Sequence, residues 1–112
     1  MSAFDAERYA AGLRHSNARE RQHSEQRLKD AQIEAVRLIQ ALKETAGCTD
    51  ACLFGSVADN SVRRIDFDID IAVWGGDILL AEGIADTSPF TVDIVQYEYA
   101  PKHLQRRIDV YR

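Results

Sequence analysis

The stretch Asp66-Phe67-Asp68-Ile69-Asp70-Ile71-Ala72-Val73-Trp74 decides how this chain folds. Its three aspartates alternate with apolar residues, and the run that follows them is rich in β-branched side chains, as in a β-strand. Side chains two residues apart on a strand lie on the same face, so Asp66, Asp68 and Asp70 should point the same way. We therefore predict a strand over residues 68–74 that begins with an acidic row.

Two further runs have the character of strands. Residues 50–54 and 91–97 are rich in Ile, Val, Phe or Tyr and are bounded by Gly, Asp, Ser or Pro. Asp93 interrupts the apolar segment Thr91-Val92-Asp93-Ile94-Val95. If the last two strands are neighbours in one sheet, Asp93 joins the acidic row of the 68–74 strand.

Apolar residues at helical spacing predict a long helix over about residues 28–46, ended by Gly47 and packed on the sheet. Its apolar positions are Leu28, Ala31, Ala35, Leu38, Ile39 and Leu42. Residues 77–86 leave room for only a short helix, and a closing helix follows Pro101. The expected fold class is α/β, with a small mixed sheet of three to four strands and the helices packed on one side.

Residues 1–27 are expected to be an N-terminal helical extension of a domain that spans residues 28–112. Apolar spacing predicts a helix over about residues 3–15. Residues 14–27 carry almost no apolar side chain, so they form either a solvated helix or a contact with a partner. A new helix beginning after Asn17 and one unbroken helix from the start fit the pattern nearly equally well.

The composition restricts the class of protein. The 112 residues fit one domain, and 14 basic against 18 acidic side chains give a net charge of −4, which argues against binding nucleic acid mainly through its phosphates. No segment approaches the roughly 20 apolar residues of a membrane span, and we expect a soluble cytoplasmic protein. Cys48 and Cys52 lack the histidines of a zinc site, so we expect reduced thiols, with Cys52 in the core.

The carboxylates of Asp68, Asp70 and Asp93 would repel one another if they met in a partly buried place. Magnesium removes that penalty, because it prefers oxygen ligands and combines one or two carboxylates with water and the phosphate oxygens of a substrate. Two such ions roughly 3.5–4 Å apart clamp the attacking and leaving oxygens of a displacement at phosphorus. The pattern therefore indicates a metal site for phosphoryl chemistry.

A second motif lies upstream, where Leu53-Phe54-Gly55-Ser56 ends the first strand. Glycine permits close approach of the backbone to a phosphate, and the following amide and hydroxyl can donate hydrogen bonds to its oxygens. Arg63 and Arg64, just before the acidic strand, are either cations that reach a phosphate or solvated loop charges. A Gly-Ser pair alone is a weak signal, and its value lies in the combination with the aspartates.

The combined pattern resembles the nucleotidyltransferase signature of the DNA polymerase beta superfamily. It consists of Gly55-Ser56, eleven intervening residues, Asp68-Ile69-Asp70 before an apolar Ile-Ala-Val, and a further strand aspartate. The chain is most similar to the minimal nucleotidyltransferases (MNT), which are often encoded beside an HEPN-domain protein. The resemblance covers about residues 28–112 and implies the nucleotidyltransferase fold.

Carried over position by position, the resemblance implies that Gly55 and Ser56 hold the triphosphate of ATP or another nucleotide. It implies that Asp68 and Asp70 bind Mg²⁺, and that Asp93 completes the metal site and helps to deprotonate the acceptor hydroxyl. It excludes Asp66, because the family places its pair directly before the Ile-Ala-Val run. The residues after Ser56 lack the Arg and Gly that are common in the family, and the segment between the second and third strands is shorter than in many relatives.

The resemblance to antitoxin members implies transfer of AMP to a tyrosine of a partner HEPN toxin, in a toxin–antitoxin system. Two alternatives stay open at this point. The chain can be a non-catalytic antitoxin that inhibits by contact, or it can modify a small molecule such as an aminoglycoside with a pocket supplied by another domain or subunit. All three functions are compatible with a homo-oligomer or a hetero-oligomer.

Overall fold

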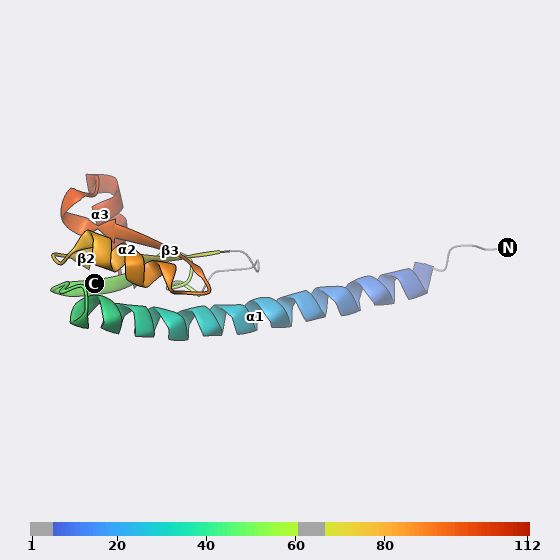
Figure 1. The fold of residues 1–112 in the computed structure, drawn as a ribbon. Helices are drawn as coiled ribbons and strands as arrows, with labels where there is room; N and C mark the ends of the chain where they lie inside the picture. The colour runs from blue at the N-terminus through green and yellow to red at the C-terminus, as the bar shows by residue number, and fades with distance from the viewer. Residues whose placement is uncertain (1–5, 61–66) are drawn as a thin grey trace.

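A computed structural model describes the backbone of residues 6–60 and 67–112 and the side chains of residues 23–60 and 67–112. The described residues form a small α/β fold with an open mixed sheet (Figure 1). The elements follow the order α1 (Ala6–Glu44), β1 (Asp50–Phe54), β2 (Asp68–Trp74), α2 (Ile78–Asp86), β3 (Thr91–Gln96), the short 3-10 helix η1 (Tyr97–Tyr99) and α3 (Lys102–Asp109). The predicted α/β class and three-stranded mixed sheet are confirmed.

Strand β2 lies in the centre of the sheet, in the order β1-β2-β3. It pairs antiparallel with β1 and parallel with β3. The predicted bounds of the first two strands are confirmed, whereas the third ends at Gln96, one residue earlier than expected. The central strand is also the acidic one, so each of its neighbours contributes residues beside the aspartates.

Helix α1 is one unbroken helix of 39 residues, which excludes a break after Asn17. At about 1.5 Å per residue it is about 58 Å long, and its N-terminal half projects beyond the sheet (Figure 1). The helix ends before Gly47, whose φ of 74° only glycine adopts readily, and the Cys48 N–H donates to the Leu42 carbonyl at 3.1 Å. The predicted helix end is therefore confirmed within two residues.

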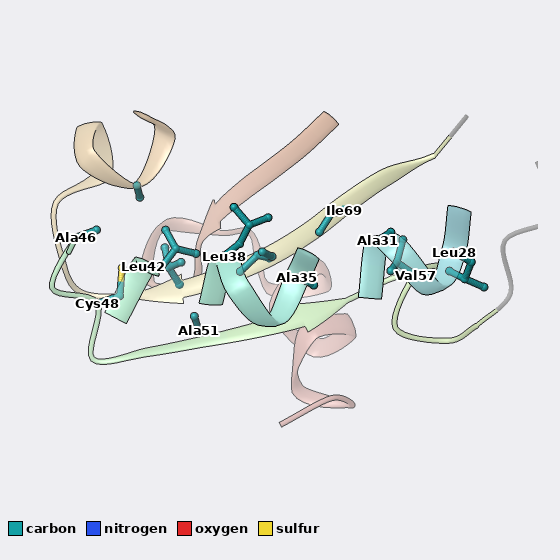
Figure 2. Packing of buried hydrophobic residues seen from close by; sticks show 13 residues of the cluster. Leu28, Ala31, Ala35, Leu38, Leu42, Ala46, Cys48, Ala51, Val57 and Ile69 are labelled. Atoms are coloured by element: carbon teal, nitrogen blue, oxygen red, sulfur yellow. The ribbon is translucent and has the colours of Figure 1, made fainter. Parts of the chain in front are cut away.

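The main hydrophobic core lies between α1 and one face of the sheet (Figure 2). From α1 it receives every predicted core position, with Leu38 and Leu42 fully buried against Ile69 and Ile71 of β2. Helix α2 closes the same cluster with Ala81, and the Asp77 side chain caps its start by accepting from the Leu79 and Leu80 N–H groups.

The expectation that the helices pack on one side of the sheet is wrong for α3. Its Ile108 is fully buried against Phe54 and Ala72, in a second cluster on the opposite face. Because adjacent residues of a strand point to opposite faces, Ala72 faces α3 while Ile71 and Val73 face α1. The sheet is therefore covered on both faces, although α3 covers only part of its own.

The two cysteines are free, but their places differ from the prediction. Cys48 belongs to the main core, whereas Cys52 is half-buried on the α3 face and its thiol donates to the Tyr111 carbonyl at 3.4 Å. Alternation along β1 explains the difference, because Cys52 shares a face with Phe54 and not with Ala51. No helix among residues 6–60 and 67–112 combines the length and apolar character that crossing a membrane requires.

Candidate functional site

Asp70 and Asp93 are register partners on the parallel strands β2 and β3. Register partners on neighbouring strands share a face, and Asp68, two residues before Asp70, lies on that face too. It is the face opposite α1, because Ile69 and Ile71 point into the main core. Asp70 is half-buried while Asp68 and Asp93 are exposed. Of the predicted acidic row, Asp68, Asp70 and Asp93 therefore lie together on the face of the sheet opposite α1.

Gly55 lies directly against the carboxylate of Asp70. Strand β1 pairs Phe54 with Asp70, and the chain then turns at Gly55 with φ of 81°. An ideal Cβ on Gly55 would lie 2.7 Å from Asp70 Oδ2. Because glycine has no side chain, the bend can pack directly against the Asp70 carboxylate. The Gly-Ser motif and the aspartate motif therefore lie in one site.

The turn after Gly55 is anchored on the opposite face of the sheet. The Asp59 N–H donates to the Gly55 carbonyl at 3.0 Å, which closes one helical turn. Val57 is fully buried in the main core, and Gln32 of α1 donates to the Val57 carbonyl at 3.2 Å. Ser56 stays exposed on this turn. A rigid bend therefore presents Gly55 and Ser56 beside the aspartates.

Burial and repulsion between carboxylates both act on the charge of Asp70, and burial is the larger influence. Burial, and then the charges of Asp93 and Asp68, raise the pKa of Asp70 to about 6, while Arg107 of α3 lowers it. These influences show that Asp70 feels both other aspartates. A cation would relieve the repulsion and favour the ionised form.

The C-terminal segment forms one wall of the site. The Tyr111 hydroxyl donates a short hydrogen bond to the Asp59 carboxylate, and this bond with burial raises the pKa of Tyr111. Sequence reasoning assigned no role to Asp59, Tyr111 or Arg107. For Tyr111 and Arg107, the sequence signal was the amphipathic pattern after Pro101, which does not show the face of the sheet on which the closing helix packs.

Two aromatic side chains of the sheet, Phe90 and Trp74, have structural roles, and three sequence candidates lie outside the described residues. Phe90 stacks on Phe67 and under Arg27 on the α1 side of the sheet, so it is not part of the acidic site. Trp74 stacks on Tyr97 in the second cluster. Three positions fall in the segment that the structure does not describe, namely Arg63, Arg64 and Asp66.

No preformed metal cage is present in the described part of the chain. Within residues 6–60 and 67–112, no group of three or more histidine, cysteine, aspartate or glutamate side chains is arranged to hold a metal ion. Comparison with known proteins adds no assignment, because neither the scan of protein-family models nor the search of curated proteins finds a match.

Proposed function

We propose that the chain is a metal-dependent nucleotidyltransferase of the minimal type, with the nucleotidyltransferase fold of the DNA polymerase beta superfamily. The observation that carries the proposal is the register pair Asp70 and Asp93, on the same face as Asp68 and against the bend at Gly55. An acidic row beside a bend without a side chain suits a nucleotide triphosphate that arrives with its metal ions.

The donor set fits magnesium. Asp68, Asp70 and Asp93 offer only hard carboxylate oxygens, and burial together with the charges of Asp93 and Asp68 raises the pKa of Asp70. Magnesium typically takes one or two carboxylates and completes its shell with waters and phosphate oxygens, so a complete protein cage is not required. When bound, it would neutralise charge on the phosphates during transfer.

The roles of the side chains are those that the resemblance to the minimal nucleotidyltransferases implies. Asp68 and Asp70 would hold the metal ions, and Gly55 with Ser56 would hold the triphosphate against them. Asp93, on the neighbouring strand, would complete the metal site and help to remove the proton from the acceptor hydroxyl. Little covalent chemistry is needed from the protein, because positioning and charge neutralisation supply most of the rate in such transfers.

The acceptor is proposed to be a hydroxyl of another protein, namely a tyrosine of an HEPN toxin encoded nearby, to which AMP from ATP is transferred. A chain of 112 residues has little surface for a private acceptor pocket. Asp93 is exposed on the edge strand β3, where a side chain delivered by a partner could reach it. The chain would thereby act as an antitoxin.

The test is to incubate the full chain with ATP, Mg²⁺ and the neighbouring HEPN protein and to measure the mass of that protein. The expected result is one added AMP, which disappears with Asp68→Asn and Asp70→Asn. Asp86→Asn is the matched control, because Asp86 is exposed at the end of α2 and belongs to the opposite layer. If both site variants still inhibit the toxin and no AMP is added, the chain is a binding antitoxin and the proposal fails.

A further inference from the structure

We infer that Arg107 of α3 is the phosphate-binding cation of the proposed site, an inference that rests on the proposed function. Three observations lead to it: the orientation of α3 on the sheet, the absence of any partner for Arg107 among the described residues, and the excess of negative charge around Asp70.

The contacts of α3 determine its rotation about its own axis. Leu104 and Ile108 pack on the sheet in the second cluster. On one flank, Gln105 Nε2 donates to the Tyr97 carbonyl at 2.7 Å and the Tyr97 hydroxyl donates to Asp109 at 2.7 Å. Residues three and four apart lie on one side of a helix, so this flank faces the end of β3.

The other flank faces the bend at Gly55. Tyr111 lies there, because its hydroxyl donates to Asp59 in the turn that follows Gly55. Tyr111 lies in the tight turn after α3, where its N–H donates to the Ile108 carbonyl at 2.9 Å, and the charge of Arg107 lowers the pKa of Tyr111, so the two side chains lie on the same flank. Gly55 in turn touches Asp70, which places the Arg107 stem at the edge of the acidic row. The guanidinium lowers the pKa of Asp70, as a nearby cation does.

Among residues 23–60 and 67–112, Arg107 has no partner that would hold its side chain in the fold. It is exposed and makes no hydrogen bond or ion pair with any residue that the structure describes. Arg112, by contrast, stacks over Trp74 at 4.6 Å and pairs with Asp109 at 3.8 Å, which secures the end of the chain. A positive side chain held beside carboxylates without such a partner is available to a ligand.

The charge balance of the proposed site calls for such a cation. Asp68, Asp70 and Asp93 contribute three negative charges when ionised, and a bound triphosphate contributes about four more. Two magnesium ions would supply about four positive charges, so a negative excess remains. Arginine suits the task, since its planar fork binds two phosphate oxygens at once and it stays charged at every working pH.

The experiment measures binding to the full chain by calorimetry, with Mg²⁺ present and two probes, ATP and inorganic tripolyphosphate. Arg107→Gln is expected to lower the affinity for both probes about tenfold or more, since a charge-assisted hydrogen bond is lost. Arg106→Gln is the matched control, because Arg106 is the neighbouring exposed arginine and points away from the sheet on the opposite side of α3. It should change affinity by less than about twofold.

Arg107→Lys separates charge from packing. Lysine keeps the positive charge, so this variant should retain part of the affinity that Arg107→Gln loses. If the role of Arg107 were purely structural, lysine and glutamine would have the same effect on affinity. Circular dichroism melts confirm that each variant is folded.

The outcomes distinguish this inference from the proposed function. Selective weakening by Arg107→Gln supports the inference. If the unaltered chain binds both probes and the two variants Arg107→Gln and Arg106→Gln bind them with equal affinity, the role of Arg107 is overturned. The proposed function then still stands. If the unaltered chain binds neither probe, both are overturned.

Discussion

A side chain on residue 55 would collide with Asp70, because an ideal Cβ there would lie 2.7 Å from Asp70 Oδ2. The bend at the end of β1 therefore packs directly against the Asp70 carboxylate of β2, and residue 55 must be glycine for both to fit.

Gly55→Ala should disturb the fold and the site together. The positive φ of 81° costs a non-glycine residue about 1–2 kcal/mol, and the new methyl group must also displace the Asp70 carboxylate. Gly47→Ala is the matched control, since Gly47 has φ of 74° but no atom within 4 Å of its ideal Cβ. Urea unfolding should show a loss for both variants, but only Gly55→Ala should also lose binding of ATP with Mg²⁺. Equal binding by the two would mean that the contact with Asp70 has no role in the site.

Asp70→Asn should make the metal-free chain more stable at pH 7.5. The pKa of Asp70 is raised to about 6, so the fold favours the protonated, neutral carboxyl and an amide imitates it. Asp70 is half-buried and solvent screens part of the repulsion, so we expect a gain of about 1 kcal/mol in the free energy of unfolding. Asp86→Asn, on the exposed end of α2, should leave that free energy unchanged. A loss of stability in Asp70→Asn would contradict the charge argument.

The free energy of unfolding of the unaltered chain should depend on pH through the Asp70 carboxyl group. Because the pKa in the folded chain lies above the ordinary 3.8, the contribution of Asp70 is fully present below about pH 4 and is lost as the pH rises through about 6. The difference between the unaltered chain and Asp70→Asn, measured by chemical unfolding from pH 4 to 8, isolates this contribution. Adding Mg²⁺ at pH 7.5 should reverse the loss in the unaltered chain and leave Asp70→Asn little changed.

Tyr111→Phe should loosen the C-terminal wall of the site. The hydroxyl that donates to Asp59 is lost, so the melting temperature is expected to fall slightly. The ultraviolet titration of the tyrosines gives an independent readout, because the pKa values of both Tyr111 and Tyr97 are raised and the variant should lose the part of the late component that belongs to Tyr111. Tyr99→Phe is the control, since Tyr99 is 81% exposed. A late component that is unchanged in Tyr111→Phe would exclude the contact with Asp59.

Leu38→Ala should test how far α1 supports the sheet. Leu38 is fully buried between α1 and β2, and truncation of such a leucine costs about 2–5 kcal/mol. Val36→Ala is two residues away on the same helix, but Val36 is 67% exposed, and a change of less than about 0.5 kcal/mol is expected. Similar losses for both variants in urea unfolding would mean that the face of α1 assigned to the core is wrong.

Much of the local structure was predictable because it depends on neighbours in sequence. The alternation in residues 68–74 identified β2, and the spacing from Leu28 to Leu42 identified the core face of α1. The bend at Gly55 and the aspartates were found by residue type and spacing. Less certain from sequence was the polar segment 14–27, where no apolar stripe distinguishes two helices from one, and the structure shows one.

By itself, the sequence determined which segments become strands and helices and which residues form the acidic row, because the periods of about 2 and 3.6 residues are local properties of the chain. Tertiary structure alone decided that Asp93 aligns with Asp70, that Gly55 meets the same carboxylate, and that α3 packs on the face opposite α1 with Tyr111 bonded to the turn after Gly55. Strand register and the choice of sheet face depend on contacts between segments far apart in the chain. A local pattern therefore leaves several such arrangements equally possible, and the packing of the whole core selects one.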